Sequence, residues 1–135
     1  MIEFQHVFKS YASGSAILED VSFRVDAGEF LFVAGPSGAG KSTLLKLIAG
    51  LEPADRGIIQ VNGQRLDRLT ARARPYLRRA VGVILQDTHL LEDRNALQNV
   101  MLPLAVTGQP NDVARSRARA ALQKVGLGGK ETALP

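Results

Sequence analysis

The sequence has 135 residues, of which 45% are hydrophobic and 22% are charged, and its net charge is +4 at pH 7. This balance excludes a disordered tail and a membrane-embedded chain, and the length suits one ordinary domain. The absence of cysteine excludes disulfides, thiolate zinc sites and thiol nucleophiles. No apolar run reaches the roughly 20 residues of a membrane span, and residues 1–10 do not resemble a signal peptide. We therefore expect a globular cytoplasmic protein.

Two antiparallel strands are predicted first. Ile2, Phe4 and His6 alternate with polar residues, and the same two-residue period returns over residues 21–25, as in strands that bury one face. Small polar residues at 12–16 predict the loop that connects them.

The next strands predict a different kind of sheet. Residues 30–34 are a continuous apolar run, which is typical of a parallel strand covered on both faces. Residues 81–85 form a second such run, so we expect both in a parallel core sheet. Between them, residues 57–61 predict a shorter strand that ends in the turn signal Asn62-Gly63.

A phosphate-binding loop stands between the first apolar run and a helix predicted at residues 42–49. The motif GxxxxGK[ST] is met by Gly35, Pro36, Ser37, Gly38, Ala39, Gly40, Lys41 and Ser42. Glycines let successive backbone N–H groups face the phosphates, and the helix adds its positive end. We expect Lys41 to reach the β- and γ-phosphates of ATP, Ser42 to bind Mg²⁺ and Thr43 to support the α-phosphate side.

A second helix is predicted at residues 95–102. Asp93 or Asn95 can cap its start, because short polar side chains accept hydrogen bonds from the first backbone N–H groups. Pro103 is expected to stop it.

Asn111 or Asp112 can cap the start of a third predicted helix, and Gly126 is expected to end it. Its apolar face is expected to consist of Ala114, Ala118, Ala121, Leu122 and Val125.

An arginine-rich stretch covers residues 65–79, which contain six arginines and only one acidic residue, Asp67. A solvated surface is the favoured interpretation, and phospholipid headgroups are the main alternative. Nucleic acid is not expected as a partner, since no aromatic residues interleave with these arginines as a single-strand platform requires.

The whole chain resembles the nucleotide-binding domain of ABC ATPases. The resemblance rests on the phosphate-binding loop, on Tyr11 at the end of the first strand and on Gln86 after the strand at 81–85. It implies that Tyr11 stacks on adenine, and that Gln86 contacts Mg²⁺ and the attacking water. Within the family, the stretches around residues 35–64 and 77–104 look most like a bacterial cell-division branch, with lipoprotein-releasing and macrolide-export ATPases as the nearest rivals.

The fold class expected from this resemblance is an α/β P-loop NTPase of the ABC ATPase type. An antiparallel β element is expected at residues 1–28, a P-loop core with part of a parallel sheet at 29–87, and the start of a helical subdomain at 88–135. The family's signature motif, its acidic Mg²⁺-binding strand and its glutamate base do not occur in the sequence. We therefore expect a truncated domain that binds ATP and Mg²⁺ but does not turn ATP over alone.

The partners implied are a permease-like inner-membrane division protein and a second ATP-binding subunit, arranged head to tail. The location implied is the cytoplasmic face of the inner membrane at the division site. Two alternatives stay open: the ATP-binding subunit of another ABC transporter, such as a lipoprotein-releasing or macrolide-type exporter, and a non-catalytic nucleotide-binding fragment.

Overall fold

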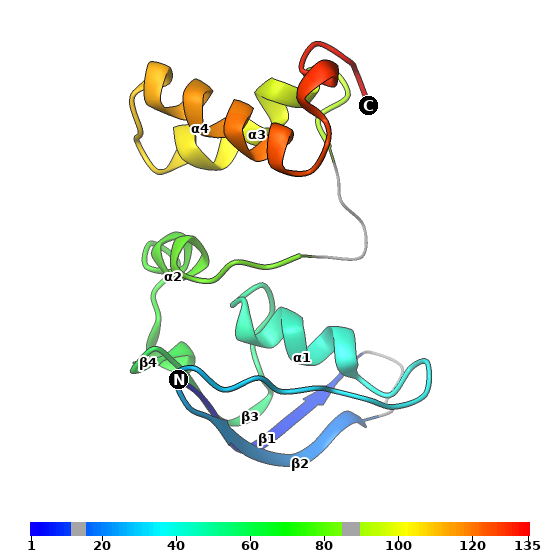
Figure 1. The fold of residues 1–135 in the computed structure, drawn as a ribbon. Coiled ribbons are helices and arrows are strands. Elements are labelled where there is room, and N and C mark those ends of the chain that lie inside the picture. Colours follow the sequence, from blue (N-terminus) through cyan, green and yellow to red (C-terminus); the bar gives the residue numbers. More distant parts are fainter. Residues whose placement is uncertain (12–15, 85–89) are drawn as a thin grey trace. The chain divides into compact units, whose positions relative to one another are not determined.

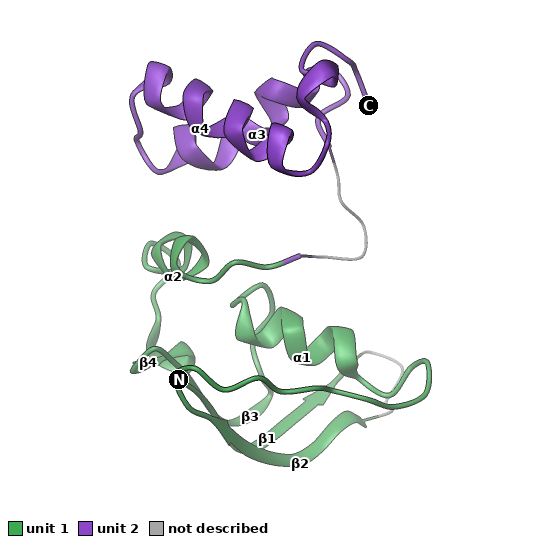
Figure 2. Cartoon of the chain, in the orientation of Figure 1, with its two compact units in different colours: residues 1–83 green, residues 84–135 purple. Residues whose placement is uncertain are grey.

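The computed structural model describes residues 1–11, 16–84 and 90–135. The chain divides into two compact units, Met1–Val83 and Ile84–Pro135 (Figure 2). Among the described residues, no helix has both the length and the apolar character needed to cross a bilayer.

The first unit is built on a four-stranded antiparallel sheet with the strand order β2-β1-β3-β4 (Figure 1). The strands are β1 (Ile2–Ser10), β2 (Ala16–Val25), β3 (Arg56–Val61) and β4 (Gln64–Arg65). In this register, Ile2 lies opposite Val25 on one side and Val61 on the other. The predicted antiparallel pair and the strand before the Asn62-Gly63 turn are therefore confirmed.

A bulge in the β1–β2 pair changes which side chains face inward. The register shifts between Phe4 and Val7, and His6 and Asp20 both adopt left-handed backbone angles, with φ of 49° and 51°. Val7 is consequently fully buried, while His6 points to solvent. The expectation that His6 continues the face of Ile2 and Phe4 was wrong, because the bulge adds a residue to the alternation.

The core of this unit lies between the sheet and helix α1 (Lys41–Ile48). Phe4 stacks on Phe23 with ring centroids 4.6 Å apart, and α1 contributes the leucines that its 3.6-residue period places on one side. The fully enclosed cluster is Phe4, Val7, Leu18, Leu44, Leu47, Ile59, Val61 and Leu77.

The two predicted parallel strands do not form as strands in the described residues. Phe30 and Phe32 are each 82% exposed and contact each other edge to face, and residues 82–84 belong to neither a helix nor a strand. A strand requires hydrogen bonds to a neighbour, and no described residue pairs with either segment. That part of the expectation is corrected. Leu85 lies outside the described residues.

The arginine-rich stretch contains two short helices that the sequence pattern did not predict. They are the 3₁₀ turn η1 (Leu66–Arg68) and the helix α2 (Arg74–Ala80). Pro75 stands in the first turn of α2, where a missing N–H costs no hydrogen bond. Leu77 anchors α2 to the core with 2% of its surface exposed.

The second unit is a pair of helices, α3 (Ala96–Val106) and α4 (Asn111–Lys124), followed by the 3₁₀ turn η2 (Gly128–Lys130). Its small core consists of Leu97, Ala118 and Leu122. The buried positions Ala114, Ala118 and Leu122 confirm most of the predicted apolar face of α4. Ala121 is exposed, and Val125 is 70% exposed because it follows the last helical residue.

Both helices of this unit differ from the prediction at one end. Asn95 caps α3 and exchanges hydrogen bonds with Gln98, as a capping box does. Pro103 does not stop α3 but lies inside it, because the helix is already nucleated by its cap and packed on α4, and one missing bond is tolerated. Helix α4 starts at Asn111 itself, with Pro110 as its cap residue.

Candidate functional site

The loop at residues 35–42 approaches β2 so closely that only glycine fits at its last turn. Gly40 has a φ of 86°, and a Cβ atom there would lie 2.9 Å from the Ile17 carbonyl oxygen and from Leu18 Cδ2. Gly38 also has a left-handed φ, of 82°. The glycines of the motif therefore set the path of the backbone into α1.

The start of α1 is free of any competing side chain. Its cap residue is Gly40, no side chain accepts from the first backbone N–H groups, and the first turn contains no acidic residue. The first N–H groups of a helix have no partner within it, and the helix dipole gives this end a partial positive charge. The loop and the helix end together have the donors and the charge that suit an anion such as a phosphate.

Lys41 adds a full positive charge at this place. Its Nζ donates hydrogen bonds to the carbonyl oxygens of Gly35 and Pro36, at 2.8 and 2.6 Å. The ammonium is thus held against the loop, where phosphate oxygens could replace the carbonyl acceptors.

Ser42 and Thr43 lie in the first turn of α1 with different exposure. Ser42 is exposed, which suits a hydroxyl that reaches a metal ion, whereas Thr43 is 7% exposed. The residues present fit a phosphate group with Mg²⁺ beside it, since hydroxyl oxygen is a ligand that Mg²⁺ accepts. Within residues 1–11, 16–84 and 90–135, no group of three His, Cys, Asp or Glu side chains could hold a metal by itself.

Tyr11 is tied to the segment that follows α1. Its hydroxyl donates to Glu52, which also accepts from Lys46 Nζ at 3.2 Å. The ammonium of Lys9 lies 5.5 Å from the centroid of the Tyr11 ring. The phenol is therefore held at its hydroxyl, and a cation stands over its ring. No hydrogen bond among the described residues joins Tyr11 to the loop at 35–42.

This network changes the titration of its members. The hydroxyl of Tyr11 lowers the pKa of Glu52, with a further contribution from Lys46 and against the effect of burial. The hydrogen bond from Lys46 to Glu52 raises the pKa of that lysine. Both groups therefore remain charged over a wider pH range than usual.

A second charged contact lies beside this network. Lys9 is 8% exposed and its Nζ lies 3.2 Å from Asp55 Oδ1. The backbone N–H and hydroxyl of Ser10 both donate to Asp55 and lower its pKa. Sequence reasoning missed Glu52 and Asp55. No signal in the sequence could have found them, because the predicted alternation assigns Lys9 to the exterior and only the bulge turns it inward.

Gln86, which was predicted to contact Mg²⁺ and the attacking water, lies outside the described residues. The adjoining residues 87–89 do too. The structure therefore places the phosphate loop, Lys41 and Ser42 together, and it places Tyr11 beside Glu52.

Comparison with known proteins agrees with this geometry. The sequence model of the ABC transporter family matches residues 18–135. The cell division ATP-binding protein FtsE of Escherichia coli K12 is 48% identical over 135 residues, which are 100% of the chain and 61% of the relative. The methionine import ATP-binding protein MetN 2 of Enterococcus faecalis is 40% identical over 139 residues, which cover 100% of the chain and 40% of that relative.

A solved structure shares the fold. The ATP-binding cassette MJ0796, in a dimeric post-hydrolysis state bound to ADP and Pi, superposes with a TM-score of 0.91 at 29% identity. The match covers 100% of the chain and 62% of that structure. The chain thus spans about three fifths of the length of FtsE and of this cassette.

Proposed function

Because the chain belongs to the ABC transporter family, we propose that it is the ATP-binding part of an ABC ATPase and holds Mg-ATP at the loop of residues 35–42. One observation carries this proposal. The first turn of α1 has no side-chain cap and no acidic residue, and Lys41 reaches back across the preceding loop to the carbonyl oxygens of Gly35 and Pro36. Such a start offers several N–H donors and a positive charge to one anionic group.

Each residue of the site has a separate task in this proposal. The ammonium of Lys41 leaves the carbonyls of Gly35 and Pro36 and pairs with the β- and γ-phosphates. The hydroxyl of Ser42 would hold Mg²⁺, which would offset the negative charge of the phosphates. Thr43 supports the loop on the α-phosphate side. Gln86 is proposed to complete the Mg²⁺ and water contacts.

Tyr11 is proposed to stack on the adenine ring. A flat aromatic face binds a nucleobase through stacking, and the contacts with Glu52 and Lys9 fix the plane of the ring. The test compares ATP with tripolyphosphate, since Tyr11→Ala should weaken only the ligand that carries a base.

The cellular role follows the relatives that the chain resembles. We propose an ATP-binding subunit of a cell-division ABC complex, with a permease-like membrane protein as partner and a second ATP-binding subunit arranged head to tail. Its place would be the cytoplasmic face of the inner membrane at the division site. Similarity to a protein named FtsE over the full chain supports this choice.

A second candidate is the ATP-binding subunit of another ABC transporter, whether an exporter or an importer. The 40% identity to a protein named for methionine import supports this second candidate. Co-purification from cells separates the candidates: recovery of a division protein supports the first, and recovery of a transport permease supports the second.

The internal organisation proposed with this function has three parts. Residues 1–28 would form the antiparallel β element, residues 29–87 the P-loop core and residues 88–135 the start of the helical subdomain. Gln86 would join the last two parts and signal the nucleotide state.

Nucleotide binding is tested with Lys41→Ala. We expect the affinity for Mg-ATP to fall at least about tenfold, because a charge-assisted contact to phosphate is lost, as measured by calorimetry. Lys124→Ala, which removes a lysine from the last turn of α4, is the matched control and should leave the affinity unchanged. Equal affinity of Lys41→Ala and the parent chain would refute the phosphate assignment.

Hydrolysis is a separate matter. None of the described hydrogen bonds or ion pairs brings a carboxylate to residues 35–42, and a general base would have to lie within reach of the attacking water. We propose that these 135 residues bind ATP without turnover. A steady release of phosphate that Lys41→Ala abolishes would contradict this.

A further inference from the structure

The arginine-rich stretch presents a surface that the proposed nucleotide site does not use. Residues 65–79 contain six arginines and one acidic residue. Arg65 is paired with Asp67 at 2.7 Å, and Arg74 lines a cavity in the first unit. Arg72, Arg78 and Arg79 are exposed, and none of them belongs to an ion pair among the described residues.

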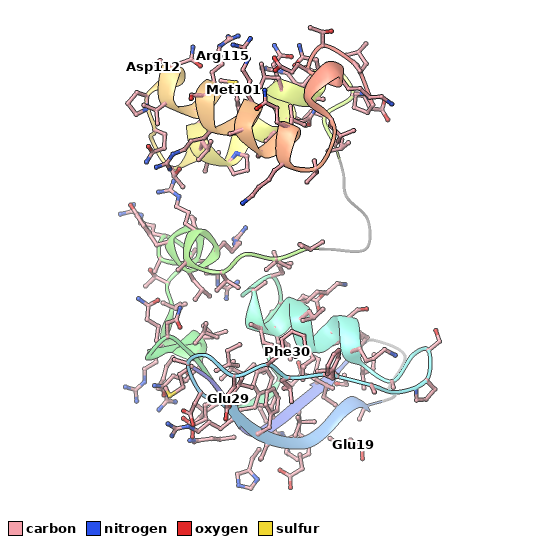
Figure 3. All side chains as sticks on the ribbon, viewed as in Figure 1. Glu19, Glu29, Phe30, Met101, Asp112 and Arg115 are labelled. Atoms are coloured by element: carbon pink, nitrogen blue, oxygen red, sulfur yellow. The ribbon has the colours of Figure 1, made fainter. Side chains whose placement is uncertain are left out.

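The backbone aligns two of these arginines and a tyrosine on one face. The N–H of Arg74 donates to the Thr70 carbonyl, so a helical turn leads directly into α2. Arg72, Tyr76 and Arg79 follow one another at intervals of four and three residues, which places them on the same side of a helix. Nitrogen-bearing side chains project from α2 in Figure 3.

The opposite side of α2 is anchored in the core. Leu77 is 2% exposed, and a Cβ atom at Gly50 would lie 2.9 Å from Leu77 Cδ2. This close packing sets the rotation of α2, so its outer face is fixed rather than adaptable. Tyr76 is 69% exposed on that face, and the guanidinium of Arg79 lies 5.3 Å from its ring centroid.

We propose that the face formed by Arg72, Tyr76 and Arg79, with Arg78 at its edge about 100° round the helix from Arg79, binds the headgroups of an anionic phospholipid bilayer. Guanidinium groups pair with phosphate through two parallel hydrogen bonds. A tyrosine with an apolar ring and a polar hydroxyl is suited to the boundary between headgroups and acyl chains. The surface joins three unpaired cations to one exposed aromatic residue, and anionic lipid supplies a counterpart for each.

One observation favours lipid over nucleic acid. Tyr76 is the only aromatic residue in the stretch, whereas single-stranded nucleic acid is bound on several aromatic side chains in succession.

The other arginine-bearing helix, α4, has acidic neighbours: Arg119 pairs with Glu131 at 2.9 Å, and Asp112 lies in its first turn. Helix α4 therefore serves as an internal control of similar charge.

The experiment is flotation of the chain with vesicles of phosphatidylcholine alone and with vesicles that also contain phosphatidylglycerol, at low and high salt. We expect binding only to the anionic vesicles, and weaker binding at high salt. The double variant Arg78→Gln/Arg79→Gln should bind about 25-fold more weakly, since each basic residue near such a surface contributes about fivefold. Tyr76→Ala should also weaken binding without a change in charge.

The matched control is Arg115→Gln/Arg117→Gln on α4, which removes the same charge from another place. It should change vesicle affinity by less than about twofold. Equal losses in the two double variants would overturn the proposal, because the effect would then be one of net charge. No binding by a folded parent chain, or tighter binding to single-stranded DNA than to anionic vesicles, would also overturn it. Circular dichroism confirms that each variant is folded.

Discussion

Two neighbouring regions of the sequence contain phenylalanine: the β1–β2 pair and the apolar segment at residues 30–34. The phenylalanines that the two regions contribute differ sharply in burial. Phe4 is 2% exposed and stacks on Phe23. Phe32 is 82% exposed, and its ring meets the ring of Phe30, which is labelled in Figure 3, edge to face with centroids 4.8 Å apart.

The difference lies in the hydrogen-bonding partner and not in the apolar character. An antiparallel pair can be completed by a neighbour in sequence, as β1 is by β2 and β3. A parallel strand needs neighbours reached through a crossover connection, and none of the described residues pairs with 30–34. Hydrophobicity therefore identifies a strand candidate, but pairing decides whether the strand forms.

The largest expected contrast compares two identical substitutions. Phe4→Ala should lower the free energy of unfolding by roughly 3–5 kcal/mol, because it removes a buried ring and leaves a cavity. Phe32→Ala should change it by less than about 0.5 kcal/mol, as expected for an exposed position. Urea unfolding followed by circular dichroism measures both. A large loss in Phe32→Ala would mean that this ring is buried in solution, and the contrast between the regions would fail.

A second pair of variants separates close packing from backbone strain. Gly57 in β3 has a φ of 89°, and a Cβ atom there would lie 2.2 Å from the His6 carbonyl oxygen. Gly28, in the turn before residue 30, has a similar φ of 85° with no atom within 4 Å. Gly57→Ala should therefore cost about 3 kcal/mol or more, from strain and overlap together. Gly28→Ala should cost about 1 kcal/mol, from strain alone.

Thermal unfolding of both glycine variants is the measurement. If they melt at the same temperature, the bulge at His6 is not held as tightly as the structure shows.

The sequence predicted what depends on local signals. The phosphate-binding loop, α1 and the β1–β2 pair follow from a motif, a helical period and an alternation, and the fold class they indicated is confirmed by the match to an ABC cassette. The bulge at His6 was missed because histidine and aspartate adopt left-handed backbone angles more readily than most residues but do not require them. Pro103 was misplaced because a proline is read as a helix end, although packing on α4 can carry the helix past it. The contact of Tyr11 with Glu52 joins residues 41 positions apart, which no local pattern reveals.

The smallest expected effect concerns the polar contact between the end of β1 and the segment that follows α1. The pKa of Glu52 is lowered in the folded chain, chiefly by the hydroxyl of Tyr11. Its ionised form therefore stabilises the fold above the unfolded pKa, and this contribution is lost as pH falls from about 4.3 through the folded value. Glu52→Gln keeps an acceptor for Tyr11 but cannot titrate, so its unfolding free energy should fall less steeply with acid, by about 1 kcal/mol or less. Glu19→Gln, an exposed glutamate of β2 in no described ion pair, should follow the parent curve. If the Glu52→Gln and parent curves coincide from neutral pH into acid, the charge of Glu52 does not stabilise the folded chain, and the contacts of Lys9 and Ser10 with Asp55 hold this end of β1 instead.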